Sequence, residues 1–314
     1  MTIGAPEENI GPPPFIVFYS LPVKKRMTQD GLPMRKKFVY FILVILGLSI
    51  LALVALRLWD ERADRMEWAR LAASPPTSPA VYDPEMVANL PEPAQRFFNF
   101  AITPGTLLLT VAEIDMGGEF SLGTRDNPNY QPMDARQILA APAGFVWKVK
   151  MPGVVSVSGS DTGSWTRFRI LGLIPVARMG GDTNHARAAY GRYVAEAVFW
   201  TPAALLPGPG VVWEALDQNT ARVTVTQNDL SQAVDLKVDA DGRPVVVQFM
   251  RWSDANPEKK HRLQPFGGQL SDFREVQGFR IPFNVEAGNM FGTDEHFVFF
   301  KARVTDVRFL VPAP

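Results

Sequence analysis

The sequence predicts a mainly β (α+β) domain, built on an antiparallel sheet with a few covering helices and preceded by one transmembrane helix. An uncharged apolar run, Phe38 to Leu56, predicts the membrane helix. After residue 106, strand and hairpin signals follow one another with a single long helix between them, and consecutive hairpins favour antiparallel pairing. With 314 residues, 46% of them hydrophobic, the chain can bury a sizeable core.

The composition removes several classes of function. Lysine plus arginine equals aspartate plus glutamate at 32 each, so no excess charge favours a nucleic-acid partner. The chain has no cysteine, which excludes disulfides, thiolate nucleophiles, zinc-thiolate sites and a lipid-anchor cysteine.

The apolar run has the length and composition of a membrane-spanning helix. Phe38 to Leu56 contains no charged side chain, and a helix of this length rises by roughly 30 Å, the hydrocarbon thickness of a bilayer. A helix of a soluble core would normally keep a polar face, which this segment lacks. Lys24 to Arg26 and Arg35 to Lys37 precede it, whereas the basic residues after it alternate with acids. We therefore expect a cytoplasmic amino terminus and a main domain outside the cytoplasm.

A cleaved signal peptide is the competing interpretation, because Met34 followed by basic residues and an apolar run is also how a secretory signal begins. The run is longer than the usual apolar region of about 7 to 15 residues. Ala52 and Ala55 also lack the spacing of a cleavage site. We favour an uncleaved signal anchor, and the start codon stays open between Met1, Met27 and Met34.

These features divide the chain into four parts. Residues 1–37 are expected to be a disordered cytoplasmic tail, and residues 38–56 the transmembrane helix. Residues 57–82 combine a polar helix with a proline-rich linker, Ser74 to Pro79, in which prolines end the helix. Residues 83–314 form the extracytoplasmic β-rich domain.

Three helices are expected in this domain. Asp83-Pro84-Glu85 supplies an N-cap, a proline at the first helical position and an acid in the first turn, so a short helix should start there. A second helix is expected from Pro93 to Ala101. The longest should run from Asn184 to about Phe199, with a cap at Asp182 or Thr183.

Strands are expected over most of the remainder. Alternating apolar residues start a strand at Thr106, and Gly117-Gly118 punctuates that run. A five-residue turn, 159–163, should join strands 154–158 and 165–170. The other expected strands are 234–239 and 245–252, which form the clearest hairpin, and then 277–286 and 297–309.

A search for catalytic motifs finds little. His185, His261 and His296 lie far apart, and none has a second ligand at metal spacing, so no metal or cofactor is predicted. Asp161-Thr162-Gly163 matches the short signature of aspartic proteases, but these are also ordinary turn residues and no second copy exists. There is no nucleophile elbow, dinucleotide fingerprint or phosphate loop. No catalytic residue is assigned, and no reaction is identified.

A group of aromatic residues with two charges is the best candidate for a site. Tryptophans under a covering helix are usually core, and Arg192 with Glu196 one turn on is usually a solvated pair. The alternative is a lining for an apolar or aromatic ligand whose acidic group an arginine holds. The candidates are Phe145, Trp147, Arg192, Tyr193, Glu196, Trp200 and Trp213.

The same residues resemble an uncharacterised bacterial family, a domain of unknown function. The resemblance covers about residues 91–307, and its most specific part is Arg192 to Glu196 followed by Trp200 to Pro207. It also includes Gln137, Pro142 to Trp147, Trp213, Asp239 to Gly242, Arg251 and Gly278 to Pro282, and it adds Arg251 to the candidate ligand-binding residues. The family has no assigned activity, so it supplies no catalytic residue.

The strand order, the Asp-x-Asp-Gly hairpin and the Gly278 to Pro282 strand are also similar, more distantly, to the LolA/LolB lipoprotein-carrier fold. That resemblance implies a curved, incompletely closed antiparallel sheet, a half-barrel that wraps an apolar cavity covered by helices. The chain has no lipid-anchor cysteine, unlike LolB, and has a membrane helix, unlike LolA, so a role in lipoprotein sorting does not follow.

The leading interpretation is a periplasmic module, anchored in the bacterial inner membrane, that binds a lipid or another apolar small molecule. The first alternative is an envelope scaffold or interaction protein whose sheet is filled by its own side chains. The second is a hydrolase that uses Glu196 or Asp161. An internal cavity favours the first interpretation, a solid interior the second, and a polar cleft with a carboxylate the third.

Overall fold

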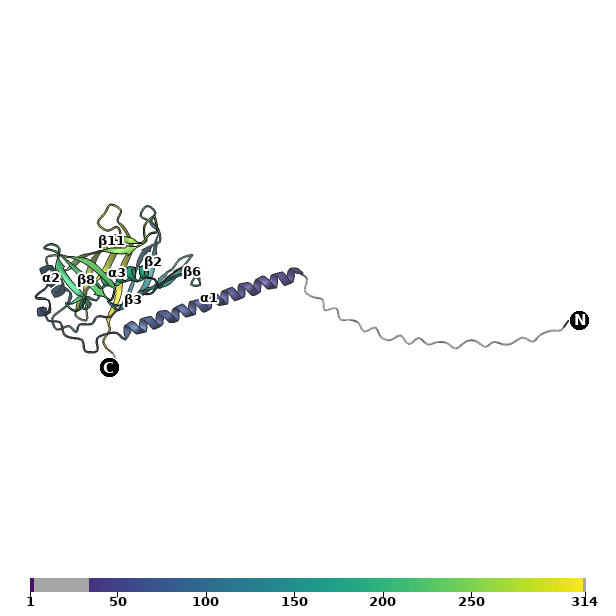
Figure 1. Cartoon of the computed structure of the whole chain (residues 1–314), viewed down its shortest axis with the longest axis horizontal. Helices are drawn as coiled ribbons and strands as arrows, with labels where there is room; N and C mark the ends of the chain where they lie inside the picture. The colour runs from purple at the N-terminus through teal and green to yellow at the C-terminus, as the bar shows by residue number, and fades with distance from the viewer. Residues whose placement is uncertain (3–33, 313–314) are drawn as a thin grey trace. The chain divides into compact units, whose positions relative to one another are not determined.

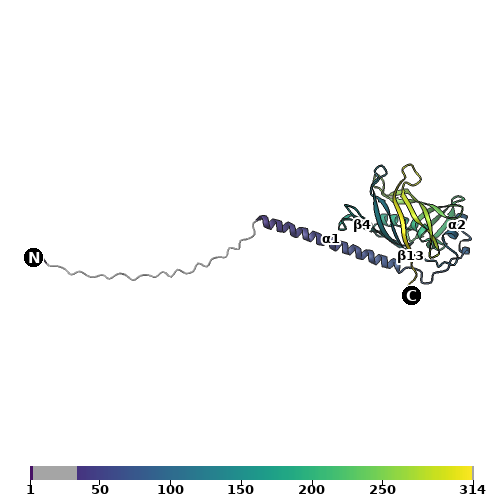
Figure 2. The ribbon, with the colours of Figure 1, turned by 180° about the vertical axis from the view of Figure 1, so that it is seen from behind.

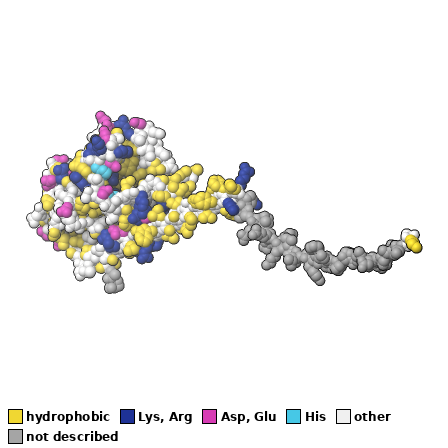
Figure 3. All heavy atoms as spheres, turned by 45° about the vertical axis from the view of Figure 1, so that its right-hand side comes forward, with side chains coloured by type: hydrophobic (Ala, Val, Ile, Leu, Met, Phe, Trp, Pro, Cys, Tyr) yellow, Lys and Arg dark blue, Asp and Glu magenta, His cyan; other side chains and the backbone are white. Residues whose placement is uncertain are grey.

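The computed structural model describes residues 1–2 and 34–312. The expected disordered tail lies mostly at residues 3–33, outside the described residues. The chain divides into two units, residues 1–49 and residues 50–314. Helix α1 (Met34–Ala72) contains one stretch long and apolar enough to cross a membrane, with a mean hydropathy of 2.9. On the face seen in Figure 3, hydrophobic side chains cover this stretch and basic side chains gather at its amino end.

The described part of the second unit is built on one sheet of 13 strands, in the order β6-β5-β4-β3-β2-β1-β13-β12-β11-β10-β9-β8-β7, and every neighbouring pair is antiparallel. The two end strands, β6 and β7, do not pair with each other, so the sheet is curved but open, as expected (Figure 1). Seen from behind, β13 lies in the middle of this sheet (Figure 2).

The strands have these bounds: β1 Ala112–Ser121, β2 Tyr130–Ala140, β3 Gly144–Met151, β4 Val157–Thr162, β5 Trp165–Ile170, β6 Ile174–Gly180, β7 Val211–Ala215, β8 Thr220–Gln227, β9 Leu230–Val238, β10 Pro244–Ser253, β11 Arg262–Val276, β12 Phe279–Asn289 and β13 Phe297–Phe309.

Helices cover the inner face of the sheet, and the three predicted ones begin within one residue of the predicted positions. The 3₁₀ helix η1 (Pro84–Val87) has Asp83 as its N-cap, and α2 (Glu92–Ala101) follows it. The Asp182 side chain accepts from the His185 N–H and so caps α3 (Thr183–Trp200), which packs on β9 and β10. A further 3₁₀ helix, η2 (Pro202–Leu205), ends this segment.

Alternation along the strands separates two apolar layers. On β3, Phe145 and Trp147 belong to the large core under α2 and α3, whereas Val146 between them packs with Leu71 of α1 on the opposite face. Successive strand residues point to opposite faces, so one strand serves both layers. The last turns of α1 therefore cover the outer face, while α2 and α3 cover the inner one.

Some expected strands are placed differently in the structure. Thr106 to Val111 forms no strand apart from a single bridge between Leu107 and Val81, and β1 begins only at Ala112. The predicted five-residue turn at 159–163 is wrong. The Thr162 hydroxyl accepts from the N–H groups of Ser164 and Trp165, which tightens the turn and leaves Asp161 inside β4.

Candidate ligand-binding site

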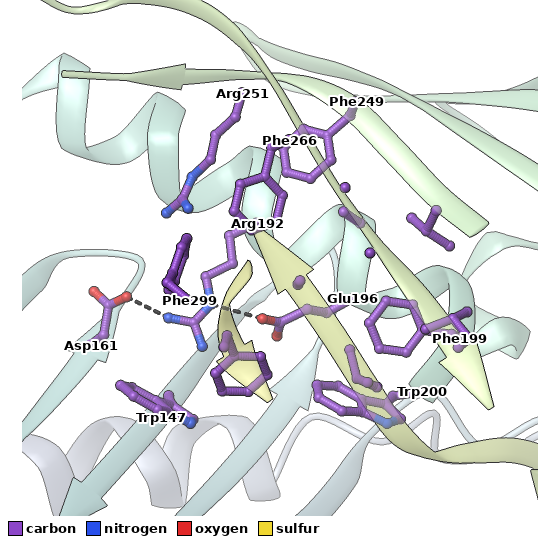
Figure 4. Close-up of a pocket in the computed structure, with 18 of the residues that line it drawn as sticks. Trp147, Asp161, Arg192, Glu196, Phe199, Trp200, Phe249, Arg251, Phe266 and Phe299 are labelled. Atoms are coloured by element: carbon purple, nitrogen blue, oxygen red, sulfur yellow. Dashed lines mark hydrogen bonds and ion pairs between the residues drawn. The ribbon is translucent and has the colours of Figure 1, made fainter. Parts of the chain in front are cut away.

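A cavity of about 300 Å³ lies between α3 and the inner face of the sheet. Its walls come from strands distant in sequence, which the order of the sheet brings together with one face of α3 (Figure 4). Most of the lining is aromatic or aliphatic. The apolar lining residues are Phe120, Trp147, Phe168, Ala195, Phe199, Trp200, Val247, Phe249, Phe266, Leu270, Val285, Ala287, Phe299 and Phe300.

Helical spacing aims three predicted residues at this cavity. Arg192, Glu196 and Trp200 follow one another at intervals of four, which places them on one face of α3. All three line the cavity. Trp200 is only 1% exposed and packs edge-on against Phe199, with 4.7 Å between the ring centroids.

The polar part of the lining centres on Arg192. Its Nη1 donates to Asp161 of β4 over 2.6 Å, and its Nε donates to Glu196 over 2.8 Å. Gln137 Nε2 donates to the other oxygen of Glu196 over 2.6 Å, and the Thr166 hydroxyl donates to Asp161 over 2.5 Å. Both carboxylates are therefore held by fixed donors, and Arg192 lies between them.

The surroundings of Arg192 favour its charged form. Burial alone would lower its pKa, but the carboxylates of Glu196 and Asp161 more than compensate, so the pKa of Arg192 is raised. The guanidinium carbon also lies 4.7 Å from the Phe145 ring centroid and 5.1 Å from that of Trp147. This cation is neutralised within the protein.

Arg251 of β10 is a second cation in the lining, with a different environment. Burial lowers its pKa, and the nearby charge of Arg192 lowers it further. Its guanidinium carbon lies 4.9 Å from the Phe266 ring centroid. Among the residues that the structure describes, Arg251 makes no hydrogen bond and no ion pair within 4.0 Å; its Nε is buried without a partner. The cavity thus has one cation that the protein does not pair.

The structure brings five of the eight predicted site residues to this cavity: Trp147, Arg192, Glu196, Trp200 and Arg251. The other three do not line it. Phe145 is fully buried in the core beside Tyr193, at 5.8 Å between ring centroids. Trp213 packs on Phe97 and Phe98 under α2, and its Nε1 donates to the Leu205 carbonyl.

Several residues that line the cavity are not identified by the sequence alone. The sequence suggests for Asp161 only a turn position or the carboxylate of a hydrolase, whereas the structure places it on the cavity wall. The phenylalanines of β1, β5, β10, β11 and β13 carry a usable signal, since several occupy alternate strand positions that face inward. The strand order that gathers them is not visible in the sequence.

A second, larger hollow of about 770 Å³ lies between the last turns of α1 and the outer face of the sheet. Half of its lining is charged, with both signs present, including Arg57, Asp64, Arg136, Lys148 and Asp134. A hollow with such a lining suits water and ions better than an apolar ligand. Within the described ranges, no group of three or more His, Asp or Glu side chains is arranged to hold a metal ion.

Residues 80–302 match the family described as a family of unknown function, DUF6544. The chain belongs to this family. The match includes all of the cavity lining named above. The family resemblance that the sequence suggested is thereby confirmed.

Solved structures that are similar to this DUF6544 chain include the following two. A LolA superfamily protein from Nitrosomonas europaea is 11% identical, with a TM-score of 0.39, over 71% of this chain and 93% of that one. A domain described as that of a candidate outer membrane lipoprotein-sorting protein from Vibrio parahaemolyticus is 11% identical, with a TM-score of 0.36, over 74% of this chain and 93% of that one. No curated protein matches the chain.

Proposed function

We propose that the chain is a periplasmic binding module for a lipid or another apolar molecule, anchored in the inner membrane by α1. The observation that carries the proposal is the cavity between α3 and the sheet, which has a mostly apolar lining and a polar group at one side. Such a concave, largely apolar site with a few placed polar groups is the usual form of a small-molecule site. The division at residues 57 and 83 and the cytoplasmic amino terminus belong to the same proposal.

The alternatives receive less support from the same contacts. A scaffold with a filled interior would not need a cavity of about 300 Å³ lined by a cation. A hydrolase would need a carboxylate free to take a proton or attack a substrate. Asp161 and Glu196 instead share Arg192, and each receives a further hydrogen bond, from Thr166 and Gln137 respectively. These bonds favour a structural role for both acids.

We expect residues 57–314, purified without the apolar run, to bind a fluorescent fatty acid, and Ala287→Phe to abolish the binding. Ala287 lies on β12 and lines the cavity, so a benzyl group there would occupy the space of the ligand. Ala255→Phe, in the exposed β10–β11 turn, is the matched control and should bind normally. Circular dichroism would establish that both variants fold. If the folded unsubstituted protein binds no apolar probe, the proposal fails.

We also expect Arg251→Gln to weaken binding of a fatty acid selectively. Removing the unpaired cation should cost about 1.5–3 kcal/mol of binding free energy, the range for a hydrogen bond to a charged group. The alcohol of the same chain length has no anionic group and should bind the variant and the unsubstituted protein alike. Equal weakening for both ligands would mean that Arg251 acts through packing on Phe266 and not through its charge.

A further inference from the structure

Two neighbouring turns at one end of the sheet carry exposed apolar side chains. Val154 and Val155 of the β3–β4 turn are 100% and 57% exposed, and Leu171 of the β5–β6 turn is 59% exposed. Ile174, at the start of β6, is 44% exposed. The turns lie side by side, because the Leu171 N–H donates to the carbonyl of Ser156 over 2.9 Å. We call these four apolar residues the apolar tip.

Local structure does not explain the leucine in this tip. The Leu173 N–H donates to the Ile170 carbonyl, and Leu171 and Gly172 between them have φ angles of 51° and 66°. Two positive φ angles define a type I′ turn, whose first position favours asparagine, aspartate or glycine. Leu171 gains neither from its backbone conformation nor from burial in the chain. A contact outside the chain would account for it.

The tip lies against α1 at the residue where the apolar run ends. Arg57 directly follows the run, and its Nη1 donates to the Gly172 carbonyl over 2.9 Å. Leu56, directly before Arg57, and Leu53, about one turn earlier, are partly buried although their helical neighbours are exposed. One turn later, Asp60 pairs with three arginines of β5 and β6, which fixes the hairpin to the helix.

We propose that the apolar tip inserts into the surface of the bilayer that α1 crosses. The inference rests on the membrane anchor of the proposed function. The tip adjoins the end of the apolar run, so the bilayer that this run crosses is the surface that the tip contacts. The charges agree with it. Arg57 pairs with Glu61, whereas the three arginines around Asp60 leave a positive excess just behind the tip. Arg178 is the exposed member of the three, at 40%, and its charge complements anionic headgroups. Insertion would fix the rotation of the domain about the helix axis.

The absence of native cysteine allows a direct test on the full chain. Leu171→Cys and Val154→Cys would each be labelled with bimane and reconstituted into vesicles of phosphatidylcholine and phosphatidylglycerol. Leu216→Cys is the matched control, because Leu216 is 43% exposed in the β7–β8 turn at the opposite end of the strands. Lipids with a nitroxide on the acyl chain quench a label that reaches the hydrocarbon, and aqueous iodide quenches one in water.

We expect the nitroxide lipids to remove most of the fluorescence at positions 171 and 154 and to leave the fluorescence at position 216 unchanged. Iodide should instead quench the label at position 216 more strongly than the labels at positions 171 and 154. Flotation of the vesicles separates the two proposals. A chain that floats with the vesicles but shows equal quenching at all three positions keeps the anchor and overturns the inserted tip. A chain that does not float overturns the membrane anchor, and with it the proposal that the tip inserts into that bilayer.

Discussion

Replacing Asp60 with alanine should destabilise the folded chain by about 3–5 kcal/mol, the range for removing one partner from a buried ion pair. Asp60 is 1% exposed on the face of α1 that meets the sheet. Arg167 approaches one of its oxygens to 3.0 Å and Arg178 the other to 2.6 Å, and Arg169 donates to it as well. One carboxylate thus neutralises charge from two strands.

The arginines explain the size of the expected effect. Burial lowers the pKa of Arg167 and of Arg169, and the positive charge of Arg178 lowers both further. Without Asp60, three like charges would remain close together, and those of Arg167 and Arg169 would have little water to solvate them. Because the contact is buried, added salt should not restore the stability.

Thermal unfolding of the full chain in detergent would measure the loss, and trypsin would localise it. If the last turns of α1 leave the sheet, Arg62 and Arg65 should become cleavable well below the unfolding temperature. Asp126→Ala is the matched control, since the Asp126 side chain is 90% exposed beside Arg125 and should contribute little. A loss of stability at position 60 no larger than at position 126 would contradict the buried cluster.

The partners of Asp60 could not be predicted from the sequence, unlike the local elements of the fold. The caps and spacing that start η1, α2 and α3 are local, and so is the hairpin of β9 and β10, which is why these elements are predictable. The partners of Asp60 lie more than 100 positions away, on two strands that no local pattern connects with α1. The docking of α1 on the outer face is what buries those arginines against Asp60.

The cavity lining likewise contains residues that local sequence predicts and residues that it does not. The spacing of Arg192, Glu196 and Trp200 is local to one helix, and the structure places all three on the cavity wall. Asp161 needs the exact position of a turn, which a single hydroxyl, that of Thr162, decides. Gly267 and Gly268, which line the cavity, lie inside β11. A Cβ on Gly267 would come within 2.7 Å of the Phe291 ring, so close packing between distant residues requires glycine there.

Trp200→Ala and Trp213→Ala should cost similar stability but differ in their effect on binding. Both tryptophans are buried, at 1% and 8% exposure, and truncating a buried tryptophan costs about 3–5 kcal/mol of folding free energy. Trp200 lines the cavity, whereas Trp213 lies against Phe97 and Phe98, outside it. The pair therefore separates loss of stability from loss of ligand contact.

Fluorescent fatty-acid titrations of the two variants of residues 57–314, made below the unfolding temperature of each, would measure that difference. Trp200→Ala should weaken binding by about 1–3 kcal/mol, because the ligand loses the contact with one large apolar side chain. Trp213→Ala should bind with unchanged affinity once the folded fraction is equal. If both variants lose affinity in proportion to their stability, Trp200 acts as a core residue, and the ligand, if one binds, does not use this wall of the cavity.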